Sequence, residues 1–175
     1  MLSIKKNFLS HLFHSFPIII LFVVVFTGFD FSFFLYEINF SFKFVSIIVF
    51  YWVLNKPHML GYGLIFFAGL INDVVQNFPI GVSSINYLLL CAIAAFIRAR
   101  IILPNFLYDW IIFFVAILIV SSIEYSVLNI IFNFPIKYET LMFNSFITFL
   151  VYPIFSKIFD EINLLNLRQE DVQEN

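Results

Sequence analysis

The chain has 175 residues, enough for one domain, and a formal net charge of −2. Hydrophobic residues make up 62% of it and charged residues 11%, whereas soluble domains are about 45–50% apolar and about 25% charged. This composition excludes an ordinary water-soluble domain, and the weakly acidic charge argues against a nucleic-acid-binding protein. We therefore expect the lipid bilayer to be the main solvent.

Six apolar segments, taken in chain order, are predicted to cross the membrane. A crossing helix needs about 20 apolar residues, and backbone that faces lipid must satisfy its hydrogen bonds within a helix. The segments are residues 13–29, 40–54, 59–76, 82–97, 107–132 and 141–159, of which the second and fourth are short. The sequence therefore predicts an all-α fold, a polytopic integral membrane protein with six transmembrane helices. Residues 1–12 precede these helices, and an acidic tail, residues 160–175, follows them.

The segments between the predicted helices are short and contain helix-breaking residues. Proline lacks an amide hydrogen and disfavours helix in the residue before it, so it fits helix ends. Pro57, Pro79, Pro104 and Pro135 all lie in these gaps. No gap exceeds about ten residues, which leaves no room for a soluble catalytic domain between the helices.

The distribution of lysine and arginine predicts the orientation. An even number of crossings places both termini on one side. That side would hold seven cationic residues: Lys5, Lys6, Lys56, Arg98, Arg100, Lys157 and Arg168. The opposite side would hold Lys43 and Lys137. Because positive residues stay in the cytoplasm, we expect both termini to be cytoplasmic.

Small and polar residues recur at helical spacing on several predicted helices. In lipid, such residues bring helices together by close approach and hydrogen bonding. The stripes are Gly61, Ala68, Gly69, Asn72 and Gln76; Ser122, Ser126, Asn129 and Asn133; and Thr140, Asn144, Thr148 and Tyr152. Two interpretations remain open: the helices pack against one another, or a stripe faces a partner protein or a ligand cavity.

Two carboxylates fall at membrane depth, where each costs at least about 2.5 kcal/mol and must be paired, hydrated or functional. We expect Asp73 near the external end of its helix, partly hydrated and capping the following turn. We expect Glu124 near the middle of residues 107–132, with no lysine or arginine at matching depth. Its partner would then be a hydroxyl, an amide or water, and its carboxyl could be neutral.

No catalytic, cofactor-binding or metal site is predicted. The stretch before Asp73 lacks the Gly-x-Gly-Asp pattern of intramembrane aspartyl chemistry. The histidines, His11, His14 and His58, fall at the cytoplasmic edge and have no apparent third metal ligand. The single cysteine, Cys91, excludes an internal disulfide and any multi-cysteine metal site.

The stretch from the second to the fourth predicted helix resembles the rod shape-determining protein MreD family of bacteria. The matching residues are Tyr51-Trp52-Val53-Leu54, Pro57, Gly61-x-Gly63, Gly69-Leu70-Ile71-Asn72-Asp73, Pro79-Ile80-Gly81 and Tyr87, with Asn144 and Pro153 in the last helix. The pattern departs from the family at Ile80, where leucine is usual, and at Asn77-Phe78, where a Ser-Gly pair is frequent. The specific motif covers about 40 residues, and the length and hydropathy fit nearly the whole chain.

The resemblance implies a non-enzymatic scaffold in the bacterial inner membrane. Such a protein would act with MreC to link cytoplasmic MreB filaments to RodA and a penicillin-binding transpeptidase. The hairpin around Asp73, Pro79 and Gly81 would form a rigid element that packs against a partner helix. The residues predicted at a partner interface or a structural interface are Gly61, Gly69, Asn72, Asp73, Pro79, Gly81, Glu124, Asn144 and Pro153.

Two alternatives remain from the residues themselves. The first is the substrate-binding membrane subunit of a vitamin transporter, another six-helix protein with short loops. Bulky residues occupy the first helix where that class carries small ones. The second is a proton-coupled carrier that uses Glu124.

Overall fold

The computed structural model describes residues 2–28, 33–35, 38–40, 42–100, 105–133 and 137–174, with side chains described at 15–28, 42–100, 105–133 and 137–164. The described part is helical apart from one short antiparallel hairpin. Its elements are α1 (Leu2–Thr27), β1 (Phe33–Leu35), β2 (Ile38–Phe40), α2 (Phe44–Asn55), α3 (Tyr62–Gln76), α4 (Val82–Arg98), α5 (Phe106–Ser126), the π-helix η1 (Val127–Ile131) and α6 (Tyr138–Glu174).

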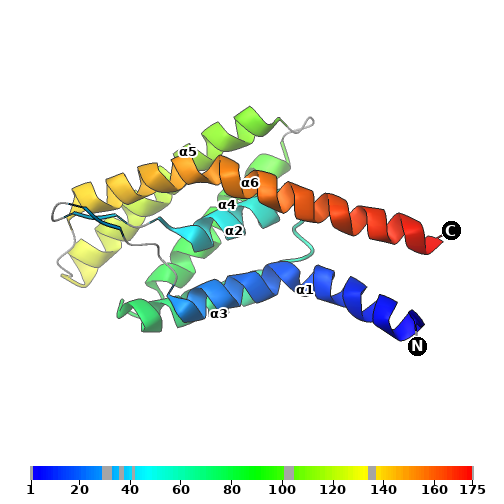
Figure 1. Cartoon of the computed structure of the whole chain (residues 1–175). Coiled ribbons are helices and arrows are strands. Elements are labelled where there is room, and N and C mark those ends of the chain that lie inside the picture. Colours follow the sequence, from blue (N-terminus) through cyan, green and yellow to red (C-terminus); the bar gives the residue numbers. More distant parts are fainter. Residues whose placement is uncertain are drawn as a thin grey trace.

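Successive helices run back and forth along one bundle (Figure 1). The N- and C-terminal ends of α1 and α6 lie at the same end and extend beyond the other helices. The β1–β2 hairpin, in which Phe34 pairs with Asn39, lies at the opposite end, together with the turn between α3 and α4. We call this opposite end the hairpin end. The placement of both termini at one end agrees with an even number of passes along the bundle.

Helix α2 is the centre of the bundle. Its sequence is apolar all round, which is typical of a helix enclosed by others. Every side chain from Val45 to Leu54 is buried, and α2 contacts α1, α4 and α6. The Phe50 ring lies 5.0 Å from that of Phe113 in α5 and 6.0 Å from that of Tyr152 in α6, measured between centroids. Aromatic residues of α2, α5 and α6 therefore meet in the core.

Helix α2 begins later than the predicted segment 40–54, because residues 38–40 form strand β2. A helix start leaves backbone amides without partners. The amide of Lys43, the residue that precedes α2, donates to Thr148 Oγ1 of α6 at 2.9 Å. A side chain 105 residues away thus satisfies one of these donors, and no local sequence signal reports it.

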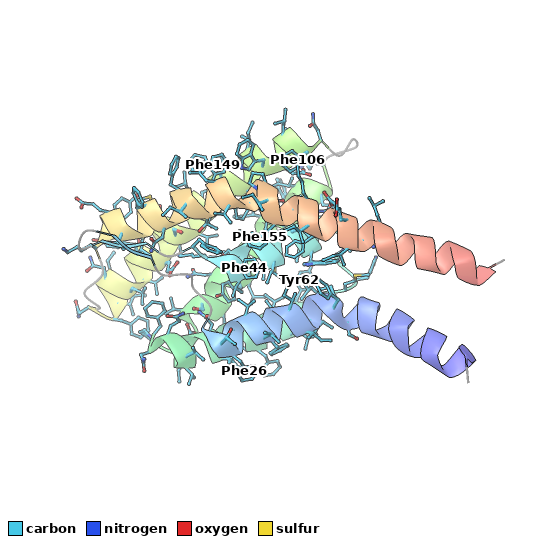
Figure 2. All side chains as sticks on the ribbon, viewed as in Figure 1. Phe26, Phe44, Tyr62, Phe106, Phe149 and Phe155 are labelled. Carbon is cyan, nitrogen blue, oxygen red and sulfur yellow. The ribbon has the colours of Figure 1, made fainter. Side chains whose placement is uncertain are left out.

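The outer surface of the bundle is apolar. Exposed side chains include Phe26 and Phe67, whereas Phe44 and Phe155 lie between helices with ring centroids 4.5 Å apart (Figure 2). Among the described residues, two helices are long and apolar enough to cross a membrane: Phe106–Ile131, with mean hydropathy 2.4, and Tyr138–Leu164, with mean hydropathy 1.4. Shorter apolar helices are Ser15–Thr27, Phe44–Asn55, Tyr62–Gln76 and Val82–Arg98. The backbone of the predicted tail, residues 160–175, continues α6 as far as Glu174.

Candidate functional site

The α3–α4 hairpin is held by the carboxylate of Asp73. Asp73 is fully buried, with 0% of its surface exposed. Its Oδ2 accepts the Gly81 amide at 2.7 Å and its Oδ1 accepts the Ser83 amide at 2.9 Å. These amides belong to the N-terminus of α4, where the helix dipole favours a negative charge. The predicted capping role is therefore observed, but the predicted partial hydration is wrong, because protein amides enclose the carboxylate.

The turn between these helices requires unusual backbone at two positions. Asn77 ends α3 with a left-handed φ of 56°, and Gly81 precedes α4 with a φ of 102°. Glycine adopts positive φ without steric cost, and asparagine tolerates it better than most residues. The Pro79 carbonyl accepts the Val82 amide at 3.3 Å and closes the turn. Together these features orient the amides at the start of α4 toward the Asp73 carboxylate.

Gly69 and Asn72 join α3 to α4 within the chain. A Cβ atom on Gly69 would lie 2.4 Å from the Ser84 Cα atom, so only glycine permits this approach. Asn72 Nδ2 donates to Ser83 Oγ at 3.0 Å. The predicted stripe on this helix is thus occupied by α4 around these two residues. Gly61, by contrast, is exposed at the other end of α3, where a Cβ would meet nothing within 4 Å.

Glu124 forms an ion pair with Lys43, whose Nζ also lies 3.4 Å from Ser121 Oγ. The expectation that Glu124 has no cationic partner is therefore wrong. Lys43 directly precedes α2, and its long side chain reaches into the bundle toward α5. Glu124 also lies nearer one end than expected, seven residues before the end of η1 at Ile131. At about 1.5 Å per residue, this is roughly 10 Å from the helix end.

Lys43 is a residue of the candidate site that the sequence did not predict. Its signal was present, because a cation at the edge of one apolar segment and an acid within another favour pairing at membrane depth. Ser121 was also missed, although the predicted stripe began at the next residue. Its hydroxyl lies 2.7 Å from that of Ser145 in α6. The pairing of Lys43 with Glu124 depends on which helices are neighbours in space, and a linear sequence does not specify this arrangement.

The predicted polar stripe of α5 does not face another helix. Ser126, Asn129 and Asn133 are exposed. The hydroxyls of Ser122 and Ser126 donate to backbone carbonyls four residues earlier in their own helix, at 2.8 and 2.9 Å. Such local bonds satisfy serine without a partner helix. The inward face of α5 carries Ser121 and Glu124 instead.

The predicted stripe of α6 does face the bundle. Asn144, Thr148 and Tyr152 are all buried. Pro153 lies one residue further, inside the helix, and lacks the amide that would bond the carbonyl of Phe149. That carbonyl accepts the Trp110 Nε1–H of α5 at 2.9 Å. The indole therefore replaces the hydrogen bond that proline removes and ties α5 to α6.

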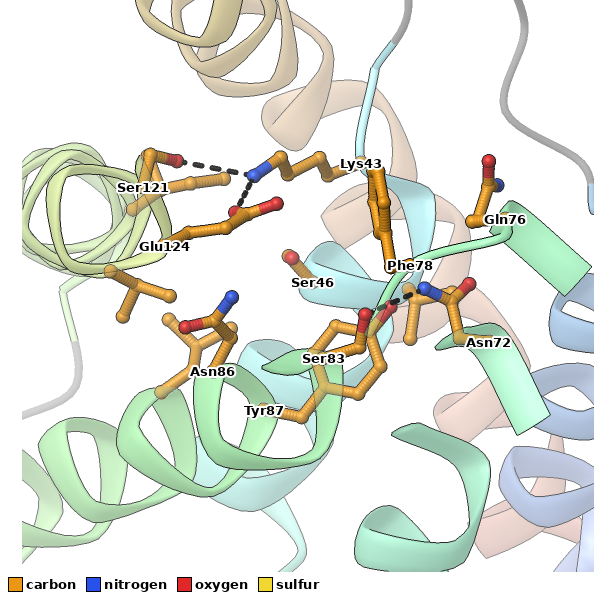
Figure 3. Close-up of a pocket in the computed structure, with 14 residues that line it drawn as sticks. Lys43, Ser46, Asn72, Gln76, Phe78, Ser83, Asn86, Tyr87, Ser121 and Glu124 are labelled. Atoms are coloured by element: carbon orange, nitrogen blue, oxygen red, sulfur yellow. Dashed lines mark hydrogen bonds and ion pairs between the residues drawn. The ribbon is translucent and has the colours of Figure 1, made fainter. Parts of the chain in front are cut away.

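A small cavity with both polar and apolar lining lies between α2, α3, α4 and α5 (Figure 3). Its volume is about 50 Å³. Its polar lining includes Lys43, Ser46, Asn72, Gln76, Ser83, Asn86, Tyr87, Ser121 and Glu124. Two of the predicted site residues, Asn72 and Glu124, thus meet at one cavity, and Asp73 adjoins it through its bond to the Ser83 amide. Gly61, Asn144 and Pro153 are not among the lining residues.

The cavity offers hydrogen bonding and paired charge. Across the described residues, no three histidine, cysteine, aspartate or glutamate side chains gather closely enough to hold a metal ion. The cation at the cavity is the ammonium of Lys43, which neutralises Glu124. The arrangement can hold small polar groups and can fix α2 to α5 through charge.

An apolar helical bundle with an enclosed central helix and a small group of polar residues in its interior defines a membrane protein of the helical class. The model of the family described as rod shape-determining protein MreD matches residues 8–162. The chain therefore belongs to the MreD family, a family of membrane proteins, and the resemblance found in the sequence is confirmed. No curated protein and no solved structure matches the chain.

Proposed function

We propose that this protein is a non-enzymatic membrane scaffold of the bacterial cell-shape machinery, and that it links cytoskeletal filaments to peptidoglycan synthesis. The observation that carries the proposal is the family match over residues 8–162. The helical bundle supports it, because short connections between packed helices suit a protein that acts through contacts with other membrane helices. The expected partners are MreC and, through it, MreB filaments, RodA and a penicillin-binding transpeptidase.

The proposed layout has six crossings of the inner membrane with both termini in the cytoplasm. Supporting it are the back-and-forth course of the helices and the placement of both termini at one end (Figure 1). That end also receives most of the lysines and arginines. Helix α2, at 12 residues and about 18 Å, is shorter than the hydrocarbon core of about 30 Å. The short length of α2 is compatible with a crossing, because neighbouring helices rather than lipid surround this helix.

The proposed contact element is the α3–α4 hairpin, made rigid by Asp73. Gly69 and Asn72 act within this element, because they face α4 and not the outside. The surface that the hairpin can offer to a partner is its exposed apolar side, which includes Phe67, Val74 and Ile85. The site residues therefore shape the contact element, and different residues would touch the partner.

Loss and restoration of cell shape test the function. In a rod-shaped host that depends on a related protein, depletion should give round cells, and expression of this chain should restore rods. MreC should co-purify with the chain from those membranes. Restored shape without MreC capture would refute the proposed partner, whereas rounded cells despite normal expression of the chain would refute the proposed function.

Photo-crosslinking tests the contact element. A benzoylphenylalanine probe in place of Phe67, which is exposed, should crosslink a membrane protein of the shape machinery. The same probe in place of Ile65, on the buried side of α3, should crosslink only within the chain. A probe at Ile111, exposed on α5, reports a different face. Capture of a partner at Ile111 and not at Phe67 would refute the hairpin as the contact element and would place the contact surface on α5.

The two alternative functions gain no support from the family. A pocket for a vitamin-sized molecule measures about 300–1,000 Å³, whereas the cavity beside Glu124 measures about 50 Å³. A proton carrier is expected to keep its carboxyl free of a fixed cation, whereas Glu124 forms an ion pair with Lys43.

A further inference from the structure

The cavity between α2, α3, α4 and α5 has the size of a water site. Its volume of about 50 Å³ exceeds the roughly 10–15 Å³ that one water molecule needs, so it has room for about three to five. Three residues at the hairpin end contribute to its lining: Lys43, Gln76 and Phe78. The cavity therefore adjoins the end of the bundle that carries the β1–β2 hairpin and the α3–α4 turn.

Two nearly buried polar side chains point into this cavity without a protein partner. Ser46 of α2 is 4% exposed and Asn86 of α4 is 5% exposed. In the described part of the chain neither side chain makes a hydrogen bond, and both point toward the space beside Glu124 (Figure 3). Burying an amide or a hydroxyl without a partner costs about 1–3 kcal/mol. Water in the cavity would remove this cost for both groups.

Water would also stabilise the ion pair at the cavity. The Lys43 side chain is 22% exposed and that of Glu124 is 9% exposed. An ion pair taken fully out of water loses hydration that its mutual attraction rarely restores. Ser121 supplies one further contact to the ammonium. Ammonium and carboxylate together offer more donor and acceptor positions than these contacts occupy, and water is the ligand that can use both kinds.

We propose that the cavity lined by Lys43, Ser46, Asn86 and Glu124 is a water-filled vestibule, open at the hairpin end, that reaches into the apolar bundle. Its ligand is a small cluster of ordered water molecules that bridge the unpartnered amide and hydroxyl to the ion pair. The vestibule hydrates the ion pair of Lys43 and Glu124 at a depth where lipid would not. It is independent of the scaffold function, which a dry cavity would leave unchanged.

Cysteine accessibility tests the vestibule. The single natural cysteine, Cys91, is buried and can be replaced by alanine to give a background free of thiols. Ser46→Cys in that background should react with methyl methanethiosulfonate, because a thiol must ionise in water before it reacts. Ile47→Cys, the adjacent and fully buried position on α2, is the matched control and should stay unmodified. Equal reactivity at both positions, or none at Ser46→Cys, would overturn the proposal.

X-ray footprinting of the unmodified protein provides a measurement that needs no variant. Hydroxyl radicals form from bound water and oxidise the side chains beside it. Tyr87, which lines the cavity, should be oxidised several-fold faster than Phe50 and Phe113 in the core. Oxidation of Tyr87 as slow as that of the core rings would show a dry cavity and refute the vestibule, whatever the outcome for cell shape.

Discussion

Removal of the Asp73 carboxylate should loosen the α3–α4 hairpin. In Asp73→Ala the amides of Gly81 and Ser83 lose the acceptors that now lie 2.7 and 2.9 Å away. Each buried amide left without a partner costs about 1–3 kcal/mol, so the variant should lose about 2–6 kcal/mol of unfolding free energy. Asp73→Asn keeps one acceptor oxygen and should lose about half as much. The ranking of the three proteins follows from the number of amides that remain bonded.

The assay is reversible unfolding by sodium dodecyl sulfate in mixed micelles, followed by the fluorescence of the two tryptophans, Trp52 and Trp110. Hydrogen exchange at the Gly81 and Ser83 amides reports the same loss locally, and both should exchange faster in Asp73→Ala. Glu139→Ala, which removes an exposed carboxylate from the first turn of α6, is the control and should cost under about 1 kcal/mol. If Asp73→Ala costs no more than this control, or if Asp73→Asn costs as much as Asp73→Ala, the capping argument fails.

Two further predictions concern close packing and a replaced hydrogen bond. Gly69→Ala should lower the unfolding free energy by about 1–3 kcal/mol, because its Cβ would lie 2.4 Å from the α4 backbone. Gly63→Ala, which has open space around it, should be neutral or stabilising in the same unfolding assay. Equal effects would contradict the close approach of the two helices. Trp110→Phe should lower the unfolding free energy by about 1–3 kcal/mol, because it leaves the Phe149 carbonyl without a donor. The loss should be smaller in a Pro153→Ala background, where the restored backbone amide can donate to that carbonyl. A double-mutant cycle without coupling would refute the replacement of that bond by the indole.

Some features of the site could be predicted from single helices. Asp73, Pro79 and Gly81 lie within nine residues of one another, so the sequence alone indicated a capped turn. The prediction failed where it needed the surroundings: the Asp73 carboxylate is enclosed and not partly hydrated. Helical spacing also identified a polar stripe on α5 but assigned it the wrong role. The hydroxyls of Ser122 and Ser126 form hydrogen bonds to backbone carbonyls of their own helix and need no partner helix.

The sequence by itself determined the solvent and the helical class, because composition and hydropathy are properties of the chain and need no neighbours. It also determined the family, through residues that cluster within about 40 positions. Only the tertiary structure decided which charged groups meet. Lys43 and Glu124 are 81 residues apart, and they pair because the start of α2 lies beside the inward face of α5. Electrostatic attraction and desolvation depend on distance in space, which a linear pattern cannot specify.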